Sequence, residues 1–437
     1  MNILHIATGL QKASGVTTFV AGLCNELAAQ GLNITIATVS GTAECALDPR
    51  IKLESIITIL QLQLSTSTIV HIHGLWSPIL HKVSNWAHCS GAKVVWSTHG
   101  MTAPWSMAHK RWKKLIPWYL YQKRDLARAA FIHCTVEKEA DWNHALGFPR
   151  TCVVPLGTHL PAANVGHRLE VIGHTADDSS LVGRDDPIAP HGRGRSPSAP
   201  RSDEASDPTK PFTILFVGRI YPVKGLVNLI NAVAKLPRSG WQLRIVGPDQ
   251  ANHKSELLSL CNTLNLSVLD ETTIIKDENG RACLPQTAEN KKGDHHSSPS
   301  PSTFTSPPSV VFTGPKFDAD LASEYDSCSI LVLPSFTENF GATVVDALAH
   351  CKPVITTKGT PWQDLLDYNC GWWIDIGVEP LIAALREAMG LHSSTSTSNF
   401  DSLREMGLKG HALVYTKYTW KAVGEKMLKS YQEVLNG

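Results

Sequence analysis

The sequence predicts an α/β protein built from two domains, each with a parallel, doubly wound sheet. The chain has 437 residues. This length is greater than that of a typical domain with a single hydrophobic core and suits two domains of typical size. In both halves, short strands that are apolar and β-branched at nearly every position alternate with helical stretches. Strands of that composition are typical of sheets covered by helices on both faces.

The first domain is predicted over residues 1–163. Between its first two strands, Phe19, Leu23 and Leu27 recur every four residues, and Gly31 follows where a helix C-terminal glycine belongs. This is a β-α-β unit, and repetition of such units implies a parallel sheet. The predicted strands begin at Asn2, Asn33, Thr68, Ala92, Ala129 and Thr151.

The second domain is predicted over residues 210–415, after a linker at 164–209. The linker and an insert at about 275–308 are rich in Pro, Gly, Ser and charge, so we expect both to be disordered. Residues 416–437 are expected to form an amphipathic helix, and its packing back on the N-terminal domain is left open. The predicted strands of this domain begin at Pro211, Trp241, Ser309, Ser329, Lys352 and Gly371.

The bulk composition argues against several functional classes. The formal net charge is +1, without the basic excess expected of a protein that neutralises many phosphates of a nucleic acid. No apolar run reaches the roughly 18 residues of a membrane-spanning helix, and the first ten residues resemble a strand more than a signal peptide. The 10 cysteines form no C-x-x-C pair. We therefore expect a cytoplasmic protein with reduced structural thiols.

The strongest motif is PSFTENFGATVVDALAHCKPVITT, from Pro334 to Thr357. A strand ends in a loop with Glu338, and a glycine then opens a helix that carries Asp346. If the loop leads straight into the helix, both acids face one cleft. Backbone N–H groups at the helix start would then meet anionic or hydroxyl groups. The alternative is that Glu338 is an ordinary N-terminal helix acid and Asp346 a solvated helix residue.

A second motif, FVGRIYPVKG, places two cations at the end of another strand. The strand ends at Gly218, and Arg219 and Lys224 lie on the loop that opens the next helix. A guanidinium and an ammonium beside a helix N-terminus can clamp a diphosphate. The alternative is that both are ordinary solvated side chains.

Together these motifs resemble the donor domain of the retaining family 4 glycosyltransferases, which have two Rossmann-like doubly wound domains facing across a cleft, the GT-B fold. The family pattern is a strand ending F-x-G-R, a lysine-glycine pair, then P-S-x-x-E-x-F-G and an acid eight positions after the glutamate. The first domain, from HIHGLWSPILH at His71 and STHGM at Ser97 onward, looks like bacterial enzymes that build lipopolysaccharide or exopolysaccharide.

The resemblance implies a role for each matching residue of the donor domain. Arg219 and Lys224 would hold the donor diphosphate, beside Gly218 of the F-x-G-R pattern. Glu338 would contact donor sugar hydroxyls, and Asp346 would accept hydrogen bonds from the ribose. The family usually has Glu at position 346 and Gly at position 351, where this chain has Asp and Cys. The loop amides expected to lie against sugar and phosphate are those of Asn339, Phe340 and Gly341.

In the first domain, Gly15 matches one position of a Gly-Gly loop that approaches the donor across the cleft, while Ser14 replaces the other glycine. His99 matches a position that reaches the donor sugar, and the alternative is a structural histidine. His71 and His73 face one side of a strand. No third ligand is spaced to complete a metal site, so we interpret them as structural or acceptor-side residues.

Residues 109–128 combine seven basic residues with interleaved Trp and Tyr. Such a surface suits an anionic membrane or a lipid-diphosphate acceptor, and the alternative is a solvated helix face packed by its aromatic residues.

The resulting hypothesis is a metal-independent, retaining hexosyltransferase without a cofactor. It would move sugar from a nucleotide diphosphate sugar to a glycan or lipid-linked acceptor in cell-surface polysaccharide synthesis, at the inner face of the cytoplasmic membrane. Arg219, Lys224, Glu338 and His99 would be its catalytic residues. The rival hypothesis is a non-catalytic relative that binds sugar nucleotides as a scaffold.

Overall fold

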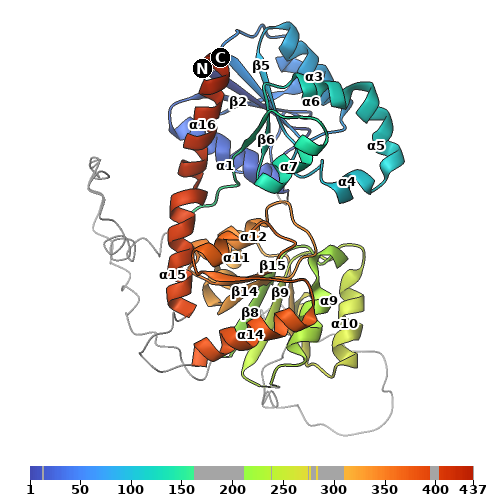
Figure 1. Cartoon of the computed structure of the whole chain (residues 1–437), viewed down its shortest axis with the longest axis vertical. Helices are drawn as coiled ribbons and strands as arrows, with labels where there is room; N and C mark the ends of the chain where they lie inside the picture. Colours follow the sequence, from blue (N-terminus) through green and yellow to red (C-terminus); the bar gives the residue numbers. More distant parts are fainter. Residues whose placement is uncertain are drawn as a thin grey trace, which may run out of the picture.

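The computed structural model contains two α/β domains stacked end to end (Figure 1). It describes residues 1–11, 14–161, 211–237, 239–273, 275–276, 282–283, 310–393 and 403–436. The predicted linker at 164–209 lies outside the described residues. Each domain has one seven-stranded sheet in which all pairings are parallel. The predicted fold class is therefore confirmed.

The N-terminal sheet has the strand order β3-β2-β1-β4-β5-β6-β7. All six predicted strands are present, and the sequence analysis missed β3, whose four residues include three polar ones. As an edge strand it needs no continuous apolar run. The strands are β1 (Asn2–Ile6), β2 (Asn33–Thr38), β3 (Lys52–Ser55), β4 (Thr68–His73), β5 (Lys93–Ser97), β6 (Phe131–Cys134) and β7 (Thr151–Val153).

Alternate side chains of these strands fill two separate cores. Ile3 and Ile69 lie in the core shared with helix α1 (Gly15–Ala29), whereas Leu4 and Val70 lie in the core on the opposite face. This division follows from the two-residue period of a strand. Other segments of this domain are α2 (Ile56–Ile59), α3 (Pro78–Cys89), α4 (Pro104–Ala108), α5 (Arg111–Pro117), the π-helical turn η1 (Trp118–Gln122), α6 (Lys123–Arg128) and α7 (Glu137–Ala145).

The C-terminal sheet has the strand order β10-β13-β9-β8-β14-β15-β16. The six predicted strands are present, and the edge strand β10 was missed. The strands are β8 (Phe212–Val217), β9 (Trp241–Val246), β10 (Val268–Asp270), β13 (Val310–Gly314), β14 (Ile330–Leu333), β15 (Val354–Thr357) and β16 (Gly371–Ile374). The helical segments are η3 (Pro222–Lys224), α9 (Leu226–Val233), α10 (His253–Thr263), η4 (Glu271–Thr273), α11 (Asp318–Ser327), α12 (Ala342–Ala349), α13 (Asp364–Asp367), α14 (Val378–Ser393) and α15 (Leu403–Leu413).

The insert predicted to be disordered at about 275–308 contains four residues with regular structure. Strands β11 (Ile275–Lys276) and β12 (Ala282–Cys283) form a two-stranded antiparallel sheet. The prediction is wrong for these residues. The intervening sequence contains Asn279-Gly280, a strong hairpin signal that a reading based on composition overlooks. The rest of the insert lies outside the described residues.

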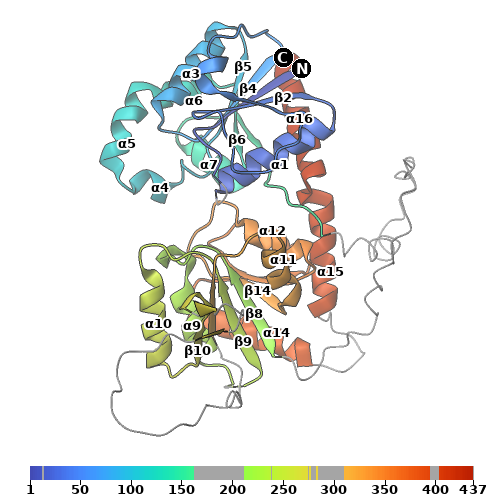
Figure 2. The same cartoon turned by 180° about the vertical axis from the view of Figure 1, so that it is seen from behind.

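The chain returns to the N-terminal domain at its end. After the π-helical turn η5 (Val414–Tyr418), helix α16 (Trp420–Asn436) runs along α1, and both chain ends lie on the same domain (Figures 1 and 2). The amide N–H of Thr158 donates to the Tyr418 carbonyl at 2.8 Å, next to the helix start. Trp420, Val423, Met427 and Tyr431 are buried, as expected for one apolar face.

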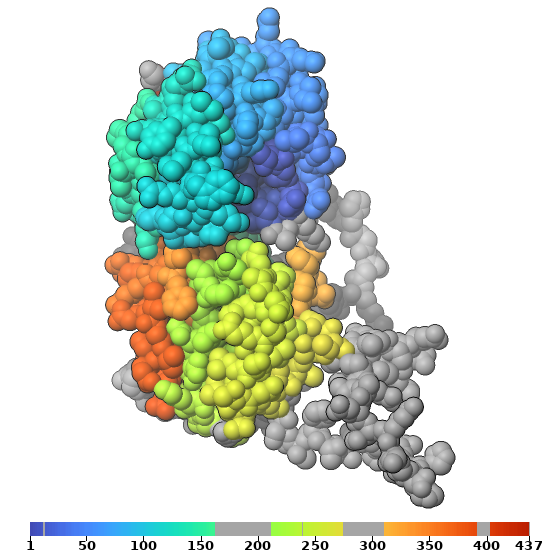
Figure 3. Space-filling view, turned by 90° about the vertical axis from the view of Figure 1, so that its right-hand side faces the viewer, coloured from blue at the N-terminus to red at the C-terminus, as the bar shows by residue number. Residues whose placement is uncertain are grey.

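Within the part of the chain that the structure describes, no helix combines the length and apolar character needed to cross a membrane. Figure 3 shows the two domains as separate masses with a hollow at the seam between them.

Candidate active site

The two predicted motifs meet at the carboxyl edge of the C-terminal sheet. Lys224 follows β8 and Glu338 follows β14, and these strands are neighbours in the sheet. Lys224 Nζ lies 2.5 Å from Glu338 Oε1, and only about 15% of each side chain is exposed (15% and 14%). Ser335 donates to the same carboxylate oxygen at 2.7 Å. The structure thus brings a cation and an acid together at the edge where open α/β sheets bind ligands.

Gly225 permits the close approach of the two loops that carry Lys224 and Glu338. Gly225 has a φ of 71°, a left-handed conformation that glycine adopts without steric cost. A Cβ at this position would lie 2.1 Å from the carbonyl oxygen of Pro334. Only glycine therefore lets the start of α9 rest against the loop that carries Glu338.

Arg219 remains open on the surface of the same edge. Its side chain is exposed, and one guanidinium nitrogen donates to Gln250 Oε1 at 2.7 Å. With this one neutral partner among the described residues, the exposed guanidinium keeps donors available for a phosphate. Its predicted role is compatible with this position.

The loop after Glu338 reaches across to the N-terminal domain. Asn339 Nδ2 donates to Thr135 Oγ1 at 2.9 Å, and its buried Oδ1 has no hydrogen-bond partner among the described residues. The Phe340 carbonyl accepts from Trp362 Nε1 at 2.5 Å. Gly341 is the N-cap of α12, with a φ of 82°. The loop predicted to contact the donor is thus held between both domains.

Asp346 lies on α12, at the boundary of the two domains. Its Oδ1 accepts from Thr158 Oγ1 at 2.7 Å, close to where the chain leaves the N-terminal domain. Burial raises the pKa of the Asp346 carboxyl to about 6, against opposing effects of the Thr158 hydrogen bond and of His350. The alternative of a freely solvated helix acid does not fit this environment. The ribose role stays a prediction.

The N-terminal domain contributes a cavity at the carboxyl ends of β1 and β4. Its volume is about 290 Å³, and Ser14, Val16 and His73 are among its lining residues. Gly15 is the first residue of α1, and a Cβ there would meet no atom within 4 Å. Close backbone approach of a ligand is therefore possible at Gly15.

His99 lies in the turn after β5 with a φ of 48°, uncommon for a residue other than glycine. The next residue, Gly100, approaches the donor-side loop, because a Cβ there would lie 2.8 Å from the Asn339 side chain. Burial lowers the pKa of His99 to about 4, with Glu139 opposing the shift. His99 is thus neutral at pH 7 and lies next to the loop that was predicted to bind the donor.

His71 and His73 belong to a layer of histidines on one face of the sheet. His5 of β1 lies beside both, and ligand atoms of the three rings lie within 4.8 Å of one another. The expectation that no third ligand accompanies the pair is wrong, because the pairing of β1 with β4 brings in a residue 66 positions earlier than His71. Sequence spacing cannot reveal a ligand supplied by a neighbouring strand.

Glu139 is a residue that the sequence analysis missed. This fully buried carboxylate accepts from Thr98 Oγ1 at 2.6 Å, from the Gly100 N–H at 2.5 Å and from the Thr135 N–H at 2.8 Å. Asn339 Nδ2 lies 3.5 Å from it. Glu139 therefore fixes the turns after β5 and β6 that face the donor-side loop. A partial signal existed in the sequence, since Glu139 is the third residue of α7, a position from which a glutamate can reach back to backbone N–H groups that precede the helix.

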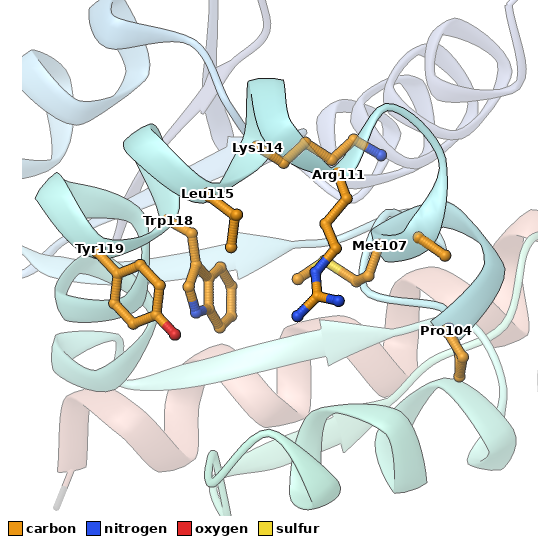
Figure 4. Close-up of a pocket in the computed structure, with 8 residues that line it drawn as sticks. Pro104, Met107, Arg111, Lys114, Leu115, Trp118 and Tyr119 are labelled. Carbon is orange, nitrogen blue, oxygen red and sulfur yellow. The ribbon is translucent and has the colours of Figure 1, made fainter.

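The basic aromatic stretch forms a separate projection of the N-terminal domain. Trp118 and Tyr121 are buried, whereas the exposed fractions of Trp112, Ile116 and Tyr119 are 69%, 70% and 75%. A cavity of about 330 Å³ lies under α4 and α5, and Figure 4 shows Arg111 and Met107 beside Leu115 and Trp118 along it. The alternative of a helix face packed by its aromatic residues holds for Trp118 and Tyr121. Trp112 and Tyr119 are exposed instead.

A further cavity, of about 800 Å³, lies between the domains. Its wall includes Phe340, residues 135–138 of the N-terminal domain and residues 360–364 and 416–418 of the C-terminal domain. The loop predicted to bind the donor therefore borders open space on the domain boundary.

Comparison with protein families supports the predicted resemblance. Residues 200–276 and 293–390 match models described as "Glycosyl transferases group 1". Similar curated proteins include a D-inositol 3-phosphate glycosyltransferase of Segniliparus rotundus, 25% identical over 248 residues, which are 55% of this chain and 44% of that protein. Sucrose synthase 1 of Hordeum vulgare is 32% identical over 104 residues, 24% of this chain and 12% of that protein. The chain thus matches less than half the length of these curated relatives.

Solved structures match the whole chain at low identity. Sucrose-phosphate synthase from Thermosynechococcus elongatus has a TM-score of 0.62 at 16% identity, and the match covers 100% of this chain and 99% of that one. HepE of Anabaena in complex with UDP and glucose has a TM-score of 0.62 at 12% identity, covering 99% and 100%. WaaG, a glycosyltransferase involved in lipopolysaccharide biosynthesis, has a TM-score of 0.57 at 15% identity, covering 100% of both chains. These likenesses confirm the GT-B fold, and the family matches place group 1 glycosyltransferase sequence in the C-terminal domain. Membership of family 4 and retention of configuration stay predictions.

Proposed function

We propose that this chain, which has the fold and the C-terminal sequence motifs of group 1 glycosyltransferases, transfers a hexosyl group from a nucleotide diphosphate sugar to a glycan or lipid-linked acceptor with retention of configuration. The observation that carries the proposal is the meeting of Lys224 and Glu338 at one sheet edge, the edge that also carries the exposed Arg219. Cations there would bind the diphosphate, and the acid would bind sugar hydroxyls. HepE of Anabaena has been solved in complex with UDP and with UDP-glucose, so UDP-glucose is the first donor to test.

In the proposed reaction, Lys224 and Arg219 stabilise negative charge that grows on the departing nucleotide. When the diphosphate binds, Lys224 exchanges part of its contact with Glu338 for phosphate oxygens, and the freed carboxylate oxygens accept from the sugar. The contacts of Asn339 with the N-terminal domain help to close the site against water. These two cations supply the charge that a metal ion supplies in other enzymes, so activity should survive chelation by EDTA.

The test is a panel of nucleotide sugars, read first by thermal shift and then by nucleotide release. A ligand that binds only the folded state raises the melting temperature, and slow donor hydrolysis without acceptor would support catalysis. With an acceptor identified, NMR of the product's anomeric proton decides whether configuration is retained. Donor binding without any turnover would support the rival scaffold hypothesis, and the absence of binding to all donors would contradict both.

We further propose that α5 and η1 hold the protein on an anionic membrane surface. Exposed aromatic and aliphatic side chains alternate there with Lys and Arg, the combination that binds anionic interfaces. Vesicles containing phosphatidylglycerol should co-sediment the protein, less so as salt rises. Trp112→Ala with Tyr119→Ala should weaken binding, whereas Trp86→Ala, on the half-buried side of α3, is a control outside the surface. Equal binding to neutral vesicles would contradict the electrostatic part of the proposal.

A further inference from the structure

Three imidazole rings form a line from the interior of the N-terminal sheet to the domain boundary. His5 Nδ1 lies 2.9 Å from His73 Nε2, and His73 Nδ1 lies 3.1 Å from His99 Nε2. His5 belongs to β1, His73 ends β4 and His99 follows β5, and these three strands are consecutive neighbours in the sheet. The line ends at His99, whose Nδ1 makes no hydrogen bond to any described residue.

The chemistry of neutral imidazole restricts which ring nitrogens along this line carry a proton. Burial lowers the pKa of His5 to about 3 and that of His99 to about 4, and it lowers that of His73 well below its ordinary value. All three rings are therefore neutral at pH 7. A neutral ring has one N–H donor and one bare acceptor nitrogen. Each of the two hydrogen bonds between rings contains one proton. All the N–H donors along the line must therefore be directed toward the same end of the line.

The buried end of the line decides the direction. His5 Nε2 is buried and has no hydrogen-bond partner among the described residues. Buried N–H donors without an acceptor are rarer in proteins than buried acceptors without a donor. His5 Nε2 is therefore the bare nitrogen. His5 Nδ1–H then donates to His73, and His73 Nδ1–H donates to His99 Nε2.

We propose that His5 and His73 are positioning residues that fix His99 as its Nδ1–H tautomer, so that His99 presents a neutral hydrogen-bond donor to an oxygen of the bound sugar nucleotide. The location of that ligand rests on the proposed function. In this state His99 has no free lone pair, because Nε2 accepts from His73 and Nδ1 carries a proton. His99 therefore binds an oxygen and does not act as a general base.

The hydrogen bonds favour this assignment over a metal site at the same histidines. Both nitrogens of His71 are taken, by Tyr431 at 2.6 Å and by Ser97 at 2.6 Å. Both nitrogens of His73 are taken by the line itself. Binding of a metal ion by His5, His71 and His73 would break several of these buried hydrogen bonds, each of which is costly to leave unmade.

The tautomer can be observed without any assay of activity. Long-range ¹H–¹⁵N NMR spectra of the ligand-free protein labelled with ¹⁵N-histidine should show His99 protonated at Nδ1 and bare at Nε2, unchanged between about pH 6 and 8. The His99→Asn variant assigns the signal. A His99 protonated at Nε2, or an equimolar bound metal ion detected by mass spectrometry, would overturn the proposal. This result is independent of whether the proposed function holds.

Variants connect the tautomer with donor use. His73→Leu should lower kcat/KM for the donor by about five- to a hundredfold, because the His99 tautomer is no longer fixed. His73→Asn, whose amide nitrogen can replace Nδ1–H, should retain more activity. His99→Asn should retain a higher kcat/KM than His99→Gln, because the Asn amide nitrogen can replace Nδ1–H of the ring. The exposed His144, bonded to Thr151 Oγ1 at 2.8 Å, provides the control His144→Ala, which should leave kinetics unchanged. A folded His73→Leu with wild-type kinetics and an unchanged His99 spectrum would refute the positioning role.

Discussion

At the scale of single residues, the site is organised by charged groups that already have partners. Lys224 and Glu338 neutralise each other in a largely buried environment, and Asp346 is held by Thr158. A donor that binds at this proposed site would compete with existing contacts, and removing one member of a buried pair leaves the other uncompensated. Mutational effects on stability and on donor binding can be separated on this basis.

Lys224→Ala should lower kcat by more than it raises the donor KM, because the lost charge acts on phosphate charge that grows during the reaction. It should also destabilise the fold by about 1–3 kcal/mol, since Glu338 becomes an unpaired, largely buried carboxylate. Adding Glu338→Gln should recover part of the stability and none of the kcat. Thermal unfolding and steady-state kinetics of the three proteins provide the measurement. A double variant no more stable than Lys224→Ala would contradict the pairing.

Asp346→Asn should raise the donor KM by about ten- to a hundredfold with little change in kcat, as expected for a hydrogen bond to a part of the donor that does not react. Asp346→Glu, with the usual family residue, should be tolerated. A large loss of kcat at unchanged KM would move Asp346 closer to the chemistry, and no effect on either would support a purely structural acid.

The raised pKa of Asp346 also predicts a pH dependence. The folded protein holds the proton up to about pH 6, above the ordinary pKa of Asp. This group therefore stabilises the fold at low pH and loses that contribution as pH rises toward 6. At pH 7, Asp346→Asn should not lower the melting temperature. The wild-type donor KM should rise as pH falls from 7 to 5, and this slope should be reduced in Asp346→Asn.

At the scale of secondary structure, the sequence predicted the strands that are apolar along their length and missed the edge strands β3 and β10. Edge strands are half-solvated, so polar residues such as Lys52 and Asp270 remove the pattern on which the prediction depends. Lys224, Glu338 and Asp346 could be placed near one edge because each follows or belongs to a recognisable motif. His5 could not be placed, because its partner His73 lies on another strand. For Glu139 only the contact with Thr135 is local in sequence, and the folded sheet is needed to bring in Thr98 and Gly100.

Helix α16 is fastened to the N-terminal domain by Trp420. Its indole lies against α1, and a Cβ at Gly22 would come within 2.1 Å of the ring. Gly22→Ala should therefore destabilise the protein by about 1–3 kcal/mol through overpacking, although Ala is the better helix former. Gly390 of α14, where a Cβ meets nothing within 4 Å, supplies the control Gly390→Ala, which should not destabilise. Chemical unfolding of both variants checks this, and an unaffected Gly22→Ala would mean that the two helices separate at little cost.

At the scale of the whole molecule, the chain crosses between the domains twice. Among the described residues, the Thr158–Asp346 hydrogen bond lies close to these crossings, and an additional polar contact spans the donor side. The crossings meet where Thr158 pairs with Thr419. The additional contact joins Asn339 to Thr135 and the buried Glu139. Group 1 glycosyltransferase sequence lies in one domain, while His99 and Gly15 lie in the other, so the relative position of the domains decides whether the site is complete.

Asn339 is expected to control that position. Asn339→Asp places a second carboxylate against Glu139, and like charges across an interface oppose association. Glu139 keeps its hydrogen bonds within the N-terminal domain, so each domain should remain folded. We expect a larger radius of gyration in small-angle X-ray scattering, together with a higher donor KM and a lower kcat, because closure both binds and completes the site. Asn339→Ala should have the weaker effect of a lost hydrogen bond. Asn231, whose side chain donates to the Val227 carbonyl of its own helix at 2.8 Å, gives the control Asn231→Ala, which should scatter as the wild type does. If Asn339→Asp has wild-type scattering and kinetics, the Asn339 contact does not govern closure, and the contacts of Thr158 with Thr419 and Asp346 set the arrangement of the domains.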